Sequence, residues 1–189
     1  MKILRRDIVL AGAGIVVLGA VLAAGITMLG AYNVAADSPH TVIVRDLIGY
    51  VRERSVEVRA ASIFVPPLGD PRMIAAGASH YDAMCTGCHL APGMEENEMR
   101  PGMNPKPPVL ASLGRGDPRE EFWIIKHGIK MTGMPAWGVT HTDGEIWNIV
   151  AFLQKMPSLS PRQYRVLAAS AADHHAHEDH DMDHMDMSH

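Results

Sequence analysis

Two thiols and an imidazole lie together in one short string, Cys85-Thr86-Gly87-Cys88-His89, which contains both cysteines of the chain. Thiols held three positions apart can each add across a vinyl group of haem, and the adjacent histidine can then bind the iron from one face. The spacing therefore predicts one covalently attached haem c, with Cys85 and Cys88 as attachment points and His89 as an iron ligand.

A Cys-x-x-Cys pair also occurs in three other settings: a disulfide, a thioredoxin-type redox pair and half of a zinc site. A thioredoxin-type pair is expected in a βαβ context, whereas the residues before Cys85 have a helical pattern. A zinc site requires a second pair of ligands at suitable spacing, and the sequence contains no further cysteine. Covalent haem is therefore favoured over all three.

A second axial ligand is expected in a loop rich in glycine and proline, whose sequence is KMTGMPAWG from Lys130 to Gly138. Methionine or histidine commonly completes the coordination of such an iron. We expect Met134 to do so, because Gly133 lets the backbone turn close to the porphyrin and Pro135 stiffens the approach of the thioether. Met131 lacks these neighbours and is the alternative.

Three helices are expected to position these groups, and no segment of residues 71–157 alternates as a β-strand does. They run from about Pro71 into the cysteine motif, from about 118 to 127, and from about 143 to 156. On the first, Ile74, Gly77 and Tyr81 share one face. The predicted fold class is all-α.

The second and third of these helices have clear boundary signals. Asp117 is the expected N-cap of the second, and Gly128 its C-cap. The third opens with a capping box in which Thr142 and Glu145 satisfy each other's backbone amides.

Residues 8–29 contain no charged side chain, and as a helix they would cross the roughly 30 Å of hydrocarbon in a bilayer. The apolar region of a cleavable signal is usually only ~7–15 residues long. We therefore favour an uncleaved single-pass anchor, although Val34-Ala35-Ala36 would suit a signal peptidase. Basic residues before the span predict a cytoplasmic N-terminus and a periplasmic position, outside the inner membrane, for everything after it.

A further helix is expected over about 40–62, with Ser38 as N-cap and Pro39 at its first position. Apolar and small residues recur on it at helical spacing, at Val44, Leu47, Val51, Ser55 and Val58. It also carries four arginines: Arg45, Arg52, Arg54 and Arg59. The helix either lies against lipid headgroups or is a solvated spacer, and the sequence leaves both interpretations open.

The chain loses its periodicity from about Ser158 and ends in HHAHEDHDMDHMDMSH. This composition cannot bury a core and predicts disorder in the absence of metal. Imidazole suits Cu(II) and thioether suits Cu(I), so the tail is a candidate copper site. Its potential ligands are His174, His175, His177, His180, Met182, His184, Met185, Met187 and His189. The alternatives are a copper-binding or copper-delivery function in the periplasm, or a solvated tail with incidental affinity for metal.

These features divide the chain into an anchor with its basic flank, a juxtamembrane helix with a proline-rich linker, a haem domain and a tail. The corresponding ranges are 1–33, 34–69, 70–157 and 158–189. The formal net charge is −4, and the acidic residues concentrate in the tail. Because the middle of the chain is nearly neutral, a general nucleic-acid binder is not expected.

The strings CTGCH and TGMPAWG, together with Gly77-x-x-x-Tyr81, resemble a class I cytochrome c over residues 71–157. The overall layout, including YNVAAD directly after the span, resembles the small membrane-anchored monohaem cytochromes c of Gram-negative bacteria. The resemblance implies that the first and last helices of the domain cross, with Gly77 and Tyr81 near Trp147 and Val150.

The same resemblance implies further residues of the haem site. A proline carbonyl after the motif is expected to accept the ring N–H of His89, and Pro108 fits that place best. Tyr81 and Trp137 are also expected to contribute to haem binding.

The expected function is electron transfer in a respiratory chain rather than catalysis. With histidine and methionine on the two axial positions no substrate reaches the iron, and no nucleophile set, phosphate loop or NAD fingerprint is present. The expected partners are a quinol-oxidising complex, a periplasmic dehydrogenase or a terminal oxidase, with lipid around the anchor. Four basic residues form either a docking face for an acidic partner or an ordinary solvated surface: Arg115, Arg119, Lys126 and Lys130.

Overall fold

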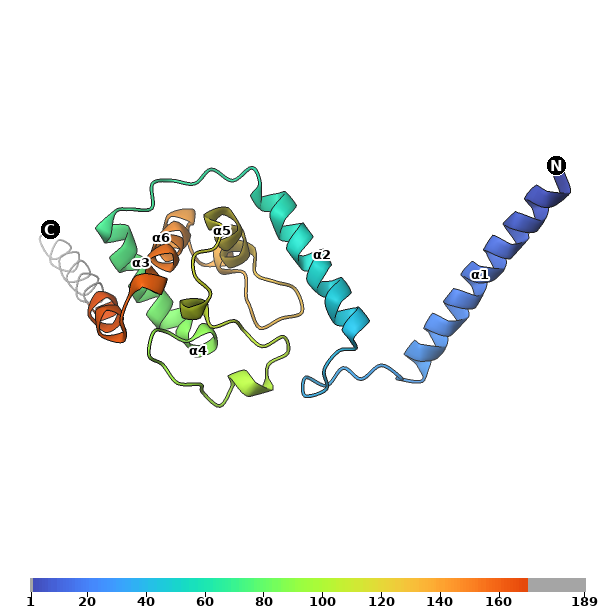
Figure 1. Cartoon of the computed structure of the whole chain (residues 1–189), viewed down its shortest axis with the longest axis horizontal. Coiled ribbons are helices and arrows are strands. Elements are labelled where there is room, and N and C mark those ends of the chain that lie inside the picture. The colour runs from blue at the N-terminus through green and yellow to red at the C-terminus, as the bar shows by residue number, and fades with distance from the viewer. Residues whose placement is uncertain (1, 170–189) are drawn as a thin grey trace, which may run out of the picture. The chain divides into compact units, whose positions relative to one another are not determined.

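The computed structural model describes residues 2–169. Within that part of the chain every regular element is a helix, which confirms the expected all-α class. The chain divides into two compact units, one ending at Ser38 and the other beginning at Pro39. The first unit contains α1, and the second contains the helices around the cysteine motif (Figure 1).

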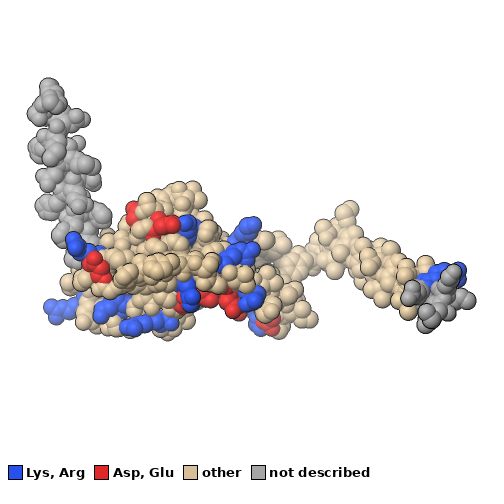
Figure 2. All heavy atoms as spheres, turned by 90° about the horizontal axis from the view of Figure 1, so that it is seen from above, with Lys and Arg blue, Asp and Glu red and all other residues tan. Residues whose placement is uncertain are grey.

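Helix α1 spans Lys2–Met28 and is apolar along most of its length. Residues Arg6–Met28 have a mean hydropathy of 2.5, and the segment is long and apolar enough to cross a membrane. Figure 2 shows uncharged spheres along this helix, with basic ones at its N-terminal end. Length and composition fit a membrane anchor, and an N-terminal signal sequence shares both properties.

Helix α2 spans Val42–Ala60 and begins later than the sequence suggested. The prediction of Ser38 as N-cap and Pro39 at the first helical position is wrong. The amide of Ser38 donates to the carbonyl of Ala35 at 3.1 Å, which closes a turn before the helix. Thr41 is the N-cap residue instead, and its side chain makes no capping hydrogen bond.

The core of the second unit is the crossing of α3 (Pro71–Met84) and α6 (Asp143–Lys155). A Cβ atom added to Gly77 would overlap the backbone carbonyl of Asn148, so only glycine permits this approach. One turn later on each helix, the rings of Tyr81 and Phe152 lie 5.2 Å apart between centroids.

The crossing is therefore the one expected, but its partners on α6 are different. Gly77 and Tyr81 meet Asn148 and Phe152, not Trp147 and Val150. Residues 148 and 152 share a face at i and i+4, and position 147 is turned away by about 100°. Trp147 accordingly stacks on Phe122 of the helix Pro118–His127 (α5), with ring centroids 4.2 Å apart.

Helix α5 (Pro118–His127) begins and ends where its caps predicted. The carboxylate of Asp117 accepts from the amide of Arg119 at 2.9 Å. Gly128 ends the helix with a φ of 64°. The capping box of α6 is also present, with the Thr142 amide donating to Glu145 Oε2 at 2.7 Å and the Glu145 amide donating to Thr142 Oγ1 at 3.3 Å.

Residues 161–169 form a further helix in a stretch that was expected to be linker. Tyr164 and Ala168 are buried on it, and the Tyr164 hydroxyl donates to the carboxylate of Asp82 on α3. At its start, Pro161 packs so closely on Gly93 that a Cβ there would lie 2.7 Å from the proline ring. This helix therefore belongs to the packed domain.

The close contact at Gly77 gives a testable consequence for stability. A Gly→Ala substitution inside a helix normally stabilises a protein by about 0.5–1 kcal/mol. Gly77→Ala should instead lower the free energy of unfolding by more than about 1 kcal/mol, because the new methyl overlaps the Asn148 carbonyl. Denaturant unfolding measures the change. Gly49→Ala in α2, where nothing lies within 4 Å, is the matched control, and equal effects at the two positions would contradict the packing argument.

Candidate cofactor site

One helical turn carries the two cysteines and the histidine. Cys85 ends α3, and α4 (Thr86–His89) follows immediately. The amides of Cys88 and His89 both donate to the Cys85 carbonyl, at 3.1 and 2.8 Å, which closes the turn. Both thiols are free and half-buried. Burial, with a smaller effect of the neighbouring Cys88, raises the pKa of Cys85 to about 12. A redox-active Cys-x-x-Cys pair has a lowered thiol pKa, which is not the direction found for Cys85.

The imidazole of His89 is held by Pro108, the residue that the family resemblance implied. Its Nδ1 lies 3.0 Å from the carbonyl oxygen of Pro108. Because a carbonyl only accepts, Nδ1 carries the proton, and Nε2 retains its lone pair for a metal. Burial lowers the pKa of His89, and the charge of Arg100 lowers it further, against the opposing effect of the Pro108 hydrogen bond. The ring is thus kept neutral, as a metal ligand must be.

The two candidate methionines differ in their surroundings. Met134 packs against the hydrophobic core, whereas the Met131 side chain is 100% exposed. The amide of Met134 donates to Thr132 Oγ1 at 3.1 Å, and its carbonyl accepts from the Ile129 amide at 3.2 Å. These bonds fix the loop with Met134 turned inward.

Two glycines allow close approaches in this loop. A Cβ at Gly133 would lie 2.5 Å from Cε of Met103, although the positive φ of the loop, 59°, belongs to Met131. A Cβ at Gly128 would lie 2.7 Å from the Met134 carbonyl oxygen and 2.6 Å from the carbonyl carbon of Pro135. Gly128 therefore shapes the loop as well as ending α5.

Tyr81 and Trp137 occupy different positions relative to this turn. Tyr81 is fully buried, and its hydroxyl donates to the Leu90 carbonyl at 2.6 Å. Burial raises the pKa of this phenol, so it remains a donor. Tyr81 therefore supports the residue that follows His89. Trp137 packs against the core and lies edge-on to His141, with ring centroids 5.4 Å apart.

Leu90 is a strained residue that sequence reasoning missed. Its φ is 57°, in the left-handed region that non-glycine residues rarely adopt, and such strain costs of order 1–3 kcal/mol. Burial of its side chain and the hydrogen bond from Tyr81 hold it there. This conformation ends α4 directly after His89.

Arg100 is the second residue that sequence reasoning missed. It is only 2% exposed, yet it carries a full charge. Its two terminal nitrogens donate to Glu96 Oε1 at 3.2 Å and to the Pro107 carbonyl at 2.7 Å. Its Nε is buried and has no hydrogen-bond partner in the part of the chain that the structure describes.

The residues present fit a haem. Cys85, Cys88 and His89 supply the attachment points and a neutral imidazole from one turn. Arg100 is already paired with Glu96, but its buried Nε–H still lacks an acceptor, and the propionates of haem are acceptors. The donor set and the charge of this region therefore match the group that the motif predicts.

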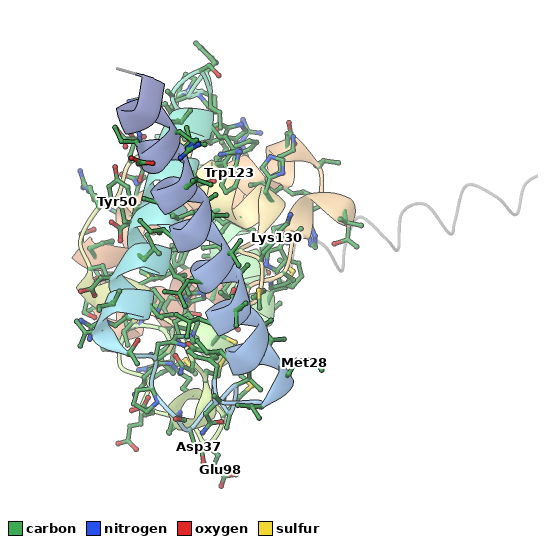
Figure 3. All side chains as sticks on the ribbon, turned by 90° about the vertical axis from the view of Figure 1, so that its right-hand side faces the viewer. Met28, Asp37, Tyr50, Glu98, Trp123 and Lys130 are labelled. Atoms are coloured by element: carbon green, nitrogen blue, oxygen red, sulfur yellow. The ribbon has the colours of Figure 1, made fainter. Side chains whose placement is uncertain are left out.

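The four basic residues considered as a docking face are partly neutralised. Arg119 pairs with Asp117 at 3.1 Å, and Lys126 pairs with Asp143 at 2.6 Å. Arg115 and Lys130 are exposed, and Lys130 is labelled in Figure 3.

The candidate copper ligands of the tail lie outside the described residues. Within residues 2–169, no group of three or more His, Cys, Asp or Glu side chains is arranged to hold a metal ion.

Residues 72–153 match the family model described as "Cytochrome C oxidase, cbb3-type, subunit III". The match covers α3, α4, α5 and most of α6, including the cysteine turn and the Met134 loop. It leaves out α1, α2 and the helix at 161–169. No curated protein and no solved structure matches the chain.

Proposed function

Because residues 72–153 form a class I c-type cytochrome domain, we propose that the protein is a membrane-anchored electron carrier of a respiratory chain. It holds one haem c on Cys85 and Cys88, with His89 and Met134 as axial ligands. One observation carries the proposal: the neutral His89 ring, fixed by the Pro108 carbonyl at 3.0 Å, lies in the same turn as both thiols.

Each residue has a defined task in this proposal. Haem c supplies a reversible one-electron iron couple. Cys85 and Cys88 each add S–H across a vinyl group, so the cofactor cannot dissociate. Pro108 orients the His89 ring, and the thioether of Met134 favours the ferrous state, which raises the reduction potential. With both axial positions filled by the protein, electron transfer is favoured over substrate binding.

Arg100 completes the site. A haem propionate near Arg100 would give its Nε–H the acceptor that it lacks among the described residues. The other two contacts of Arg100 hold Glu96 and the Pro107 carbonyl. Because Pro107 adjoins Pro108, Arg100 also acts on His89 as a positioning residue.

The expected setting is the periplasmic side of the inner membrane. Helix α1 retains the protein there as a single-pass anchor with its N-terminus in the cytoplasm. The matching family is described as a subunit of a cytochrome c oxidase, which supports a terminal oxidase as partner. A quinol-oxidising complex or a periplasmic dehydrogenase would supply the electrons, and exposed Arg115 and Lys130 are available for docking.

An absorption spectrum of the protein, produced together with a haem-attachment system, tests the proposal. The dithionite-reduced protein should show the sharp bands of a low-spin haem, and the haem should resist acid extraction. In Cys85→Ser and Cys88→Ser together, the haem should become extractable or be lost. A colourless protein loaded with zinc or copper would overturn the proposal and favour the alternative copper function of the tail.

A further inference from the structure

Helix α2 has two apolar faces, and only one of them is covered. Val56 and Ala60 are buried where α2 packs on α5. Seven large apolar side chains of this helix are 54–81% exposed. Two of them are Val42 and Ile48. The other five share one side of the helix and are called the apolar stripe here: Ile43, Leu47, Tyr50, Val51 and Val58; Tyr50 is labelled in Figure 3.

The two faces lie on opposite sides of the helix. At about 100° per residue, the members of the stripe fall within a sector of roughly 100°. Val56 projects about 170° and Ala60 about 130° from the middle of that sector. Packing on α5 and exposure of the stripe therefore do not compete, and the helix can bind two surfaces at once.

The stripe has the composition of a surface at the edge of a bilayer. It combines branched aliphatic side chains with one tyrosine, a residue enriched where membrane meets water. Arg54 lies within the same sector, and its guanidinium bonds Glu57 at 2.8 Å at the outer end of a long aliphatic stem. Such a side chain can cover apolar surface while its charge remains among headgroups.

The chain itself keeps α2 close to a membrane. Residues 29–41 join α1 to α2, and a chain extends at most about 3.5 Å per residue. If α1 spans the bilayer, α2 begins within about 45 Å of the end of the span. The apolar phase nearest to the stripe is then lipid.

We propose that the apolar stripe of α2 lies at the boundary between headgroups and acyl chains of the membrane that α1 spans. This inference rests on the proposed anchoring by α1. Helix α2 would be a second, peripheral contact with the membrane. Because its other face packs on α5, which leads through Gly128 into the Met134 loop, lipid contact would fix the orientation of the haem domain on the surface.

Nitroxide labels on the full-length holoprotein test this contact. The protein is reconstituted in vesicles of phosphatidylcholine and phosphatidylglycerol after labelling at Leu47→Cys, in the stripe, or at Arg52→Cys, on another side of the same helix. The ratio of collision with oxygen, which concentrates in lipid, to collision with a water-soluble nickel chelate should be several-fold higher at position 47. An unchanged haem spectrum confirms that each labelled variant is folded.

Three results would overturn the inference. Equal accessibility to the nickel chelate at both positions would place α2 in solution, although the anchor holds. Dipolar broadening at position 47 that disappears on dilution with unlabelled protein would assign the stripe to a second copy of the chain. Release of the protein from the vesicles by alkaline carbonate would instead contradict the anchoring by α1, and with it this part of the proposed function.

Discussion

Met134→Ala is expected to lower the reduction potential by on the order of 100 mV or more, because axial ligands set haem potentials across about 0.8 V. A thioether stabilises ferrous iron, and its removal leaves water or a harder ligand in its place. Of the two methionines in this loop, Met134 is the one that packs against the core. Redox titration measures the shift, and the weak long-wavelength charge-transfer band of thioether-ligated ferric haem should disappear with it.

Met131→Ala is the matched control for this prediction. It removes the same side chain from the same loop, three residues earlier, but from a fully exposed position. The potential and the charge-transfer band should stay as in the unaltered protein. The assignment is wrong if the two variants exchange these behaviours, since Met131 would then be the ligand.

Local signals predicted most of the haem domain. The cysteine motif, the Asp117 cap and the Thr142 capping box each involve residues within a few positions of one another. Their geometry depends on the backbone of one turn, which is the same in any protein. The boundaries of α5 and α6 could be read for that reason.

The helix at 161–169 was missed although its signals were present. Ser160 and Gln163 form a reciprocal capping box, with the Ser160 amide donating to Gln163 Oε1 at 2.8 Å. Pro161 occupies the first helical position, where proline is favoured. The polar and acidic tail that follows has no apolar periodicity, so the whole stretch from Ser158 is predicted as linker and tail. Burial of Tyr164 against α3 was not readable, because the contact joins residues 82 positions apart.

The sequence does not predict the burial of Arg100 or the positive φ of Leu90, for physical reasons. An arginine is normally exposed, and nothing in the sequence around Arg100 indicates that the loop buries it. A leucine with a positive φ contradicts its own preference, so propensity predicts against it. Both depend on long-range packing around the cysteine turn, which supports the view that strain and buried charge concentrate at functional sites.

Arg100→Gln is expected to lower the reduction potential, because a buried cation near the iron disfavours the ferric state. Two unit charges about 10 Å apart interact by roughly 1.7 kcal/mol at an effective dielectric constant of about 20. That energy corresponds to about 70 mV for a one-electron couple. The Glu96 carboxylate, 3.2 Å from the Arg100 guanidinium, partly offsets the charge, so the shift should lie below this figure. The Arg100 side chain is 2% exposed, so solvent screens it little. Redox titration of the holoprotein at constant ionic strength gives the shift.

Arg100→Lys separates the charge of this residue from its hydrogen bonds. It keeps the cation but loses the fork that reaches both Glu96 and the Pro107 carbonyl. The potential should remain closer to that of the unaltered protein than in Arg100→Gln. The electron paramagnetic resonance g values should change, because the Pro107–Pro108 segment no longer holds the His89 ring. Arg119→Gln, an exposed arginine paired with Asp117, should change neither quantity. If Arg100→Gln behaves like Arg119→Gln, the buried guanidinium does not act on the haem, and its burial only ties the loop together.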